Sequence, residues 1–288
     1  MTRRAVQDAP AGQDGARPLS RWRSHVFLIA FTLVTLFPVL WVVKMALRPE
    51  QTFATGLNPL PTEFSLQNFA DLVAEPLFLR QLANSVIVSA ATTILGVFLA
   101  CTAAYAFSRF RFPGRRAGLL AFLVTQMFPG TLMMIPLYVV LDALGLLDQL
   151  LGLILVYATT AIPFCVWMLK GYFDTIPRAI EESAMMDGAG PFTLFWRIIL
   201  PLARPAVAVT ALFSFMTAWN EYILAATFMS DEASYTLPVR LQHFVGAYTT
   251  EWGHFAAGAL LVSTPVMLLF FALQKQLVGG LTAGGVKG

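Results

Sequence analysis

The sequence is poor in charged residues. Of its 288 residues only 12% are charged, whereas 57% are hydrophobic and the mean hydropathy is +0.69. A soluble domain usually carries about a quarter charged residues. The apolar residues also form long continuous blocks instead of the amphipathic stripes of a soluble helical domain. Water is therefore not the solvent for most of this surface, and the chain is predicted to be an integral membrane protein.

Cysteine, histidine and clustered basic residues are also scarce. The two cysteines, Cys101 and Cys165, fall inside apolar blocks, which argues against a disulfide framework. His25, His243 and His254 lie far apart and have no metal-ligand spacing, so no metal site is predicted. The net charge is only +3, and the basic residues do not form the patch that nucleic-acid binding requires. No nucleic-acid partner is expected.

Six apolar blocks are each long enough to cross a membrane, because about 20 apolar residues span roughly 30 Å of hydrocarbon. The first is longer than the apolar core of a signal peptide, so we expect it to remain as a helix. The fold class is therefore predicted to be all-α, a polytopic membrane helical bundle with six transmembrane helices. Its tails are residues 1–24 and the glycine-rich 276–288, its six-span membrane domain is 25–275, and its spans are about 25–47, 83–107, 117–140, 149–170, 205–228 and 255–275.

The basic residues are divided unevenly between the two sides of these six spans. All but four of the 19 Lys and Arg residues fall on the side that holds the two tails. The four exceptions are Lys44, Arg48, Arg80 and Arg240. Because basic residues concentrate in cytoplasmic loops, both termini are predicted to be cytoplasmic, which agrees with an even number of spans.

The most informative segment is the cytoplasmic loop 171–204, which reads GYFDTIPRAIEESAMMDGAGPFTLFWRIILPLAR. Pro177 suits the first turn of a helix, since its missing N–H would have no partner there. Gly188 favours the left-handed conformation that ends a helix. Pro191 then opens a second helix, which is predicted to end at Leu200. The loop is therefore expected to form two short helices joined by a glycine turn.

These two helices have the features of a surface on which another protein docks. Ser183 and Ala184 are small, so a partner can approach the first helix closely. The carboxylates of Glu181, Glu182 and Asp187 are then available to pair with basic groups on that partner. The alternative is an ordinary amphipathic connector at the membrane interface with solvated acids.

The spacing in this loop resembles the EAA signature of importer-type ABC transporter permeases: Glu-Ala-Ala, three residues, Gly, nine residues, Ile, one residue, Leu-Pro. One position departs from the signature, where serine replaces the first alanine. In that family the helix pair couples the permease to the ATP-hydrolysing subunit. The residues in register are Glu182, Ser183, Ala184, Gly188, Ile198, Leu200 and Pro201.

An ATP site of its own is missing from the sequence. A P-loop ends in Gly-Lys-Ser or Gly-Lys-Thr, and no lysine here is followed by Ser or Thr. Together with this absence, the resemblance implies a transporter subunit and not an enzyme. It would bind no cofactor itself, and a separate ATPase would use ATP and Mg²⁺.

The resemblance extends along nearly the whole chain. The segments FSLQNFADL, AYAFSRFRFPGRR and TAWNEYILA resemble the carbohydrate-uptake branch, and the end LVGGLTAGGVKG resembles the smaller membrane subunit of maltose-type transporters. In such proteins the tail inserts between two ATPase subunits, which makes Gly284, Gly285 and Lys287 expected contacts. The resemblance implies a second permease, an ATPase dimer and an extracytoplasmic sugar-binding protein as partners in a bacterial inner membrane. The implied cargo is maltose-, maltodextrin- or trehalose-like.

Glu221 is the one carboxylate inside a predicted span. Such a group costs about 2.5–3.5 kcal/mol to insert, so it should face the bundle interior or a wet cavity. Trp219 and Asn220 beside it would add an aromatic face and an amide, a combination that suits a sugar pathway. An interhelical hydrogen bond to the second permease is an equally good interpretation.

Two other functions remain open. The same importer could carry another oligosaccharide or glycerol phosphate, although a phosphorylated cargo would favour Arg or Lys in the pathway and no span interior has one. An ion-driven secondary sugar transporter, or a scaffold protein, would leave the EAA spacing and the glycine tail unexplained. The secondary transporter should also show an internal repeat, and none is evident.

Overall fold

The structure, a computed structural model, is all-helical apart from an isolated bridge between Val245 and Thr250 in the part that it describes. This confirms the predicted fold class. Side chains are described from residue 22 to residue 276, except those of residues 54, 55, 57, 59, 62, 247 and 248. The backbone is described for residues 18–53, 56, 58, 60–61, 63–246 and 249–285.

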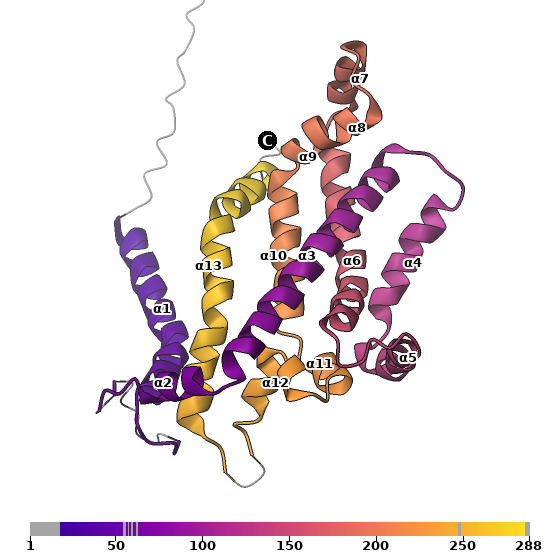
Figure 1. Ribbon diagram of the computed structural model, residues 1–288. Helices are drawn as coiled ribbons and strands as arrows, with labels where there is room; N and C mark the ends of the chain where they lie inside the picture. The colour runs from indigo at the N-terminus through magenta and orange to yellow at the C-terminus, as the bar shows by residue number, and fades with distance from the viewer. Residues whose placement is uncertain are drawn as a thin grey trace, which may run out of the picture.

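Four long helices form the frame of the molecule (Figure 1). Among the described residues, these four are long and apolar enough to cross a membrane as single helices. They correspond to the first, second, fourth and sixth expected spans. Their bounds are α1 (Pro18–Ala46), α3 (Phe78–Arg109), α6 (Leu150–Thr175) and α13 (Trp252–Gly285).

The third expected span, 117–140, is not one straight helix. It is divided into α4 (Arg115–Met127) and α5 (Gly130–Ala143), which meet at 103°. Pro129 lies at the joint, and proline disfavours helical backbone in the residue before it. Phe128 is accordingly extended, with ψ of 129°.

The fifth expected span, 205–228, is also interrupted. α10 (Arg204–Trp219) ends before α11 (Ile223–Phe228) begins, and α10 itself meets the preceding helical segment Pro191–Leu202 at 79°. Counting each strongly bent pair as one span gives up to six spans among the described residues.

Shorter helices lie at the two ends of the long ones. One end carries α2, α11 and α12, and the other carries α7 and α8 (Figure 1). We refer to these as the α2 end and the α7 end. The short elements are α2 (Gln67–Ala74), α7 (Arg178–Met186), α8 (Pro191–Thr193), the π-helix η1 (Leu194–Ile199), α9 (Leu200–Leu202), the 3₁₀-helix η2 (Glu232–Ser234) and α12 (Leu237–Gln242).

The centre of the bundle is α3, which packs along both α6 and α10. Small residues on α3, such as Ala100 and Ala104, are fully buried and let the helices approach closely. Against them lie Leu169 and Phe173 of α6 and Ile199 of η1. This core packs η1, which follows α8 at the α7 end, against α3 and α6.

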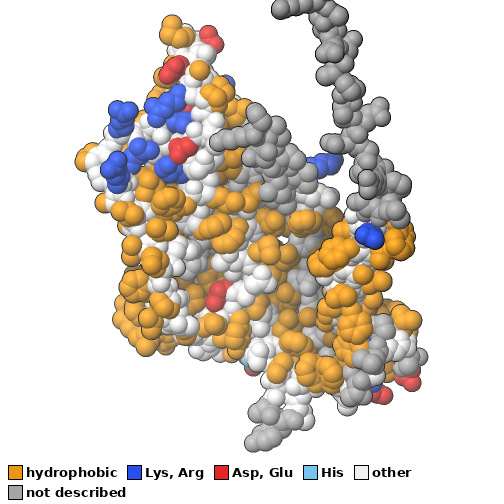
Figure 2. All heavy atoms as spheres, turned by 180° about the vertical axis from the view of Figure 1, so that it is seen from behind, with side chains coloured by type: hydrophobic (Ala, Val, Ile, Leu, Met, Phe, Trp, Pro, Cys, Tyr) orange, Lys and Arg blue, Asp and Glu red, His pale blue; other side chains and the backbone are white. Residues whose placement is uncertain are grey.

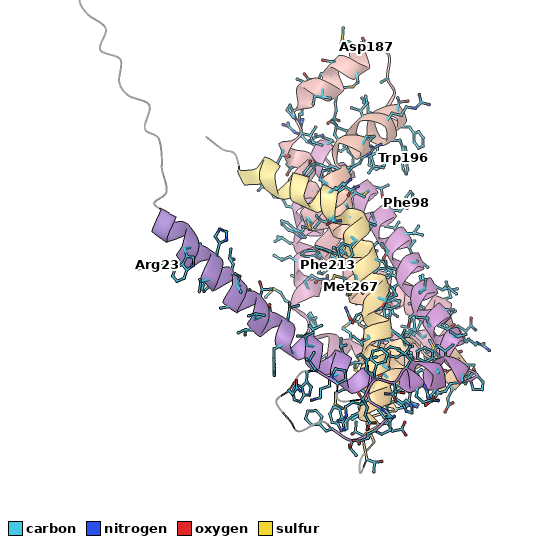
Figure 3. The ribbon with its side chains drawn as sticks, turned by 90° about the vertical axis from the view of Figure 1, so that its left-hand side faces the viewer. Arg23, Phe98, Asp187, Trp196, Phe213 and Met267 are labelled. Atoms are coloured by element: carbon cyan, nitrogen blue, oxygen red, sulfur yellow. The ribbon has the colours of Figure 1, made fainter. Side chains whose placement is uncertain are left out.

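α1 packs along α13 and diverges from the rest of the bundle (Figures 1 and 3). Its side chains from residue 22 to residue 40 are exposed, and burial begins only near Lys44. Figure 2 shows a largely hydrophobic flank, with Lys and Arg side chains gathered at the α7 end. An apolar flank with a basic end is the surface of a membrane protein.

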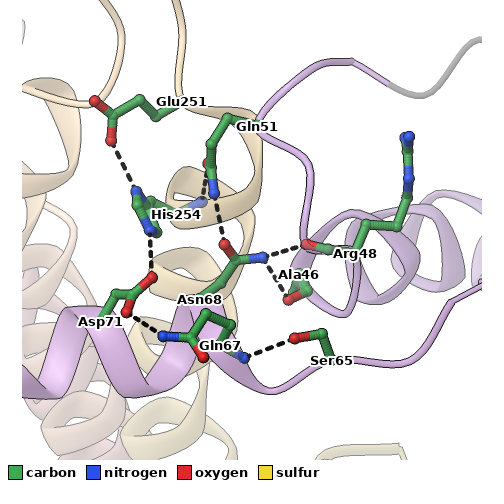
Figure 4. A network of polar contacts seen from close by, with 9 residues as sticks. All are labelled: Ala46, Arg48, Gln51, Ser65, Gln67, Asn68, Asp71, Glu251 and His254. Carbon is green, nitrogen blue, oxygen red and sulfur yellow. Dashed lines mark hydrogen bonds and ion pairs between the residues drawn. The ribbon is translucent and has the colours of Figure 1, made fainter.

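A polar network fastens the buried end of α1 to α2 and α13 (Figure 4). The amide nitrogen of Asn68 donates to the carbonyls of Ala46 and Arg48, at 3.0 and 2.6 Å. The side chain of Gln51 donates to Asn68 Oδ1 at 2.7 Å and accepts from the backbone N–H of His254 at 3.0 Å. We call these contacts the α2-end network.

Candidate coupling and transport sites

The glycine turn of the loop forms as the sequence predicts. Gly188 has φ of +87°, a left-handed conformation that only glycine adopts without strain. Its N–H donates to the carbonyl of Met185 at 3.0 Å, and the N–H of Ala189 donates to that of Ala184 at 2.9 Å. These two bonds satisfy carbonyls at the end of α7 and turn the chain sharply.

The second helix of the loop is less regular than expected. It starts at Pro191, passes through the π-helix η1 and ends at Leu202. Pro201 has no N–H to donate to the carbonyl four residues back, and Leu200 bonds Phe195, five residues back. We refer to residues 177–202 as the coupling hairpin.

The coupling hairpin is fastened to α3 by a buried ion pair. Arg109 Nε donates to one carboxylate oxygen of Glu181, and the Tyr105 hydroxyl donates to the other at 3.1 Å. Arg109 also donates to the carbonyl of Ile176 at 3.0 Å. The side chains of Arg109 and Glu181 are only 8% and 9% exposed. A carboxylate this buried depends on such partners, so α7 is held rigidly on α3.

The same arginine connects α3 to α6. Arg109 donates to the Ser108 hydroxyl at 3.1 Å, and Ser108 donates to Asp174 at 2.6 Å. Lys170 pairs with the other oxygen of Asp174 at 2.6 Å. We call the group that joins α3, α6 and α7 the clamp: Tyr105, Ser108, Arg109, Asp174 and Glu181.

The expected docking face divides into exposed and internal residues. Glu182, Ser183 and Asp187 are exposed, and Asp187 lies at the far tip of the molecule (Figure 3). Glu181 departs from expectation: it is buried as part of the clamp, where it pairs with Arg109. The other residues of the signature are the exposed Gly188 and the half-buried Ala184, Ile198, Leu200 and Pro201.

The expected tail contacts are only partly described. The backbone stays helical from Trp252 through Gly285, so Gly284 and Gly285 complete α13. Lys287 lies outside the described residues.

The structure does not bring Trp219, Asn220 and Glu221 together in one open site. Trp219 is 1% exposed, and its indole N–H donates to the carbonyl of Val262 at 3.1 Å. Asn220 is exposed and bonds the carbonyl of Met216 at 2.8 Å. Trp219 thus packs α10 against α13 and offers no ring face to a ligand.

Glu221 makes its interhelical hydrogen bond within this chain. It accepts from the Tyr157 hydroxyl of α6 at 2.8 Å and from the backbone N–H groups of Leu224 and Ala225, at 2.9 and 3.1 Å. The carboxylate therefore caps α11, where the positive end of a helix favours an anion. Sequence reasoning missed Tyr157, because its partner lies 64 residues away.

A bundle of apolar helices with broken spans, and with a helical hairpin clamped to one end, is the architecture of a membrane permease. Residues 92–282 match the family described as "Binding-protein-dependent transport system inner membrane component". The chain belongs to this family, whose members are membrane components of transporters. The family predicted from the EAA spacing is thereby confirmed.

Similar proteins cover nearly the whole chain. The maltodextrin permease MdxG of Bacillus subtilis (strain 168) is 37% identical over 95% of this chain and 98% of its own. The maltose/maltodextrin permease MalG of Vibrio vulnificus (strain YJ016) is 41% identical over 93% of this chain and 96% of its own. The trehalose permease SugB of Mycobacterium tuberculosis (strain CDC 1551 / Oshkosh) is 36% identical over 95% of this chain and 100% of its own.

A solved structure shares the architecture. A chain of a bacterial ABC transporter involved in alginate import superposes with a TM-score of 0.76 at 25% identity, over 93% of this chain and 100% of that one. A second alginate transporter chain, solved with a periplasmic protein, has a TM-score of 0.66 at 15% identity and shows the same fold.

Proposed function

We propose that this chain is a permease subunit of an ATP-driven importer that carries a maltose-, maltodextrin- or trehalose-type sugar. The observation that carries the proposal is the coupling hairpin, whose exposed acids face away from the bundle while the clamp ties it to α3 and α6. The relatives named above transport such sugars. The chain would reside in a bacterial inner membrane.

The hairpin supports one orientation and one set of partners. The α7 end would be cytoplasmic, and both the start of α1 and the end of α13 point toward that end (Figure 1). An ATPase dimer would bind Glu182, Ser183 and Asp187, and it would hold the ATP and Mg²⁺. A second permease would complete the pathway, and an extracytoplasmic binding protein would deliver sugar to the α2 end. The residues near Gly284 and Lys287 would reach the ATPase.

The clamp gives this arrangement a mechanism. When the ATPase dimer closes, it displaces α7, and the buried pair of Glu181 and Arg109 transmits the displacement to α3. The hydrogen bond from Ser108 of α3 to Asp174 of α6 then transmits the displacement to α6. The permease then exchanges between two arrangements of its spans, whose populations the ATPase and the binding protein bias. No covalent intermediate is needed.

The test is ATP hydrolysis by the assembled complex in proteoliposomes. The chain is co-expressed with its partner permease, ATPase and binding protein, and maltose, maltotriose, trehalose and glycerol phosphate are supplied in turn. We expect stimulation by one of the sugars, and only when the binding protein is present. An active complex that none of the sugars stimulates would contradict the cargo. Failure of any ATPase to associate with the intact hairpin would contradict the importer itself.

A further inference from the structure

Two helix breaks lie close together in the bundle. α4 runs 13 residues from the α7 end to its break, and α10 runs 16, which is roughly 20 and 24 Å at 1.5 Å per residue. The helices that follow the breaks, α5 and α11, contact one another and lie at one level (Figure 1). Two spans are therefore broken at a similar depth, and the two breaks lie next to each other.

Broken backbone at membrane depth needs polar surroundings. Lipid offers no hydrogen bonds, so irregular backbone occurs there only where protein covers it or where it lines a wet cavity. At the second break Glu221 caps α11. At the first break α5 begins at Gly130, its N-cap residue Pro129 makes no side-chain cap, and Phe128 is 58% exposed. The α4–α5 joint is thus the break that no described side chain of this chain caps.

A pocket of about 360 Å³ opens at this joint. Its polar lining comes from Thr125 and Gln126 of α4 and from Thr159 and Thr160 of α6, and its apolar lining includes Phe128 and Leu224. Small-molecule sites usually measure about 300–1,000 Å³ and combine apolar walls with a few polar groups. The pocket has both properties.

The lining offers uncharged donors and acceptors. Gln126 donates one amide hydrogen to the carbonyl of Thr160 at 3.1 Å. Within the described residues its second amide hydrogen and its carbonyl oxygen have no partner. Thr125, Thr159 and Thr160 donate to backbone carbonyls of their own helices, which leaves their hydroxyl oxygens free to accept. No charged residue lines the pocket.

We infer that this pocket is a binding site for a neutral, polyhydroxylated ligand, a sugar ring on its way through the membrane. The inference rests on the proposed function. It assigns to this chain a sugar site at the α4–α5 joint, in place of the one expected at Trp219 and Glu221. Hydroxyl groups need both donors and acceptors, which Gln126 and the threonines supply, and the exposed Phe128 ring can cover an apolar sugar face. A phosphate or carboxylate would require a cation.

The first test removes the polar lining in the reconstituted complex. Gln126→Leu and Thr160→Val delete the amide and one hydroxyl at nearly constant volume. Thr102→Val is the matched control, because Thr102 is exposed on α3 and bonds its own helix in the same way. We expect Gln126→Leu to raise the KM for maltotriose uptake roughly three- to tenfold. An effect of this size corresponds to the loss of one or two uncharged hydrogen bonds. ATPase activity without sugar should stay unchanged, as should uptake by the control.

A second measurement does not depend on uptake kinetics. An added Cβ at Gly130 meets nothing within 4 Å, so Gly130→Cys should fold. The native Cys101 and Cys165 are buried and give little background. We expect maltotriose to slow maleimide labelling of the Gly130→Cys variant at least threefold and to leave the Gly171→Cys variant, at the other end of α6, unaffected. Glycerol phosphate should not protect either one.

The outcomes separate the two proposals. Normal uptake by Gln126→Leu together with unprotected labelling at position 130 would overturn the site while leaving the importer intact. Protection by glycerol phosphate but not by maltotriose would overturn the neutral ligand class. If the wild-type complex moves none of the sugars, the proposed function fails, and the site fails with it.

Discussion

Two neighbouring glutamates of the coupling hairpin have opposite environments. Glu181 is buried against Arg109, whereas Glu182 is exposed. Successive residues of a helix point about 100° apart, so a helix that docks with one face presents the next residue to solvent. One acid therefore fastens α7 to the bundle, and the other remains available to a partner.

Glu181→Gln should weaken the joint between α7 and α3. It leaves the buried guanidinium of Arg109 without its carboxylate, and breaking a buried pair from one side costs about 3–5 kcal/mol. We expect lower thermal stability of the purified complex and loss of sugar-stimulated ATPase activity. Differential scanning fluorimetry and the proteoliposome assay measure the two effects.

The control for this change is Glu182→Gln, which should leave stability unaltered because the side chain is exposed. The double variant Arg109→Gln, Glu181→Gln removes both charges and should recover part of the stability. Equal stability of Glu181→Gln and the wild-type complex would show that the pair does not hold α7.

The sequence predicted which segment would dock on a partner but not how that segment is held on the bundle. The EAA spacing is local, so Glu182 and Gly188 could be assigned from a single stretch. Arg109 and Glu181 are 72 residues apart, and no periodicity connects them. Trp219 shows the same limit, since a tryptophan beside a carboxylate suits a sugar site or a helix interface equally well. Only packing decides between the two.

At the scale of whole elements, the glycine turn sets the direction of the hairpin. Gly188→Ala should strain it, because left-handed backbone costs an L-residue about 1–2 kcal/mol. Gly190→Ala is the matched control, since Gly190 has φ of −76° and nothing within 4 Å of an added Cβ. We expect Gly188→Ala to weaken ATPase binding up to roughly tenfold in a pull-down titration and the control to bind normally. Weaker ATPase binding by Gly190→Ala than by Gly188→Ala would refute the role of the turn.

The helices were predictable from hydropathy, and their breaks were not. Pro38, Pro136, Pro163 and Pro265 all lie inside continuous helices, whereas Pro129 stands at a 103° bend. Composition cannot separate these cases, because membrane helices tolerate proline when neighbours satisfy the freed carbonyls. The helix that follows the bend, α5, also contacts α11, which begins 80 residues after α5 ends.

On the scale of the whole molecule, α3 connects the two ends. Its last two turns carry Tyr105 and Arg109 of the clamp. Near its start, Gln81 and Asn84 bond carbonyls of the segment 232–235, on the side of the α2 end. A displacement of α7 therefore reaches the opposite end through one continuous helix. α1 packs along α13 instead, and its last residues, Met45 and Ala46, join the apolar cluster that holds Phe78 at the start of α3.

The attachment of α1 depends on Asn68, whose side chain is 1% exposed and has all its polar atoms bonded. Asn68→Leu would leave two carbonyls of the α1 end and the amide of Gln51 without partners, at about 1–3 kcal/mol for each buried group. We expect a lower unfolding temperature of the purified complex, whereas Gln67→Ala, which removes an exposed contact to Asp71, should change it little. The signature residues of the coupling hairpin are untouched, so ATPase binding should persist in the same pull-down. Loss of ATPase binding at unchanged unfolding temperature would instead show that the α2-end network acts on coupling and not on the anchoring of α1.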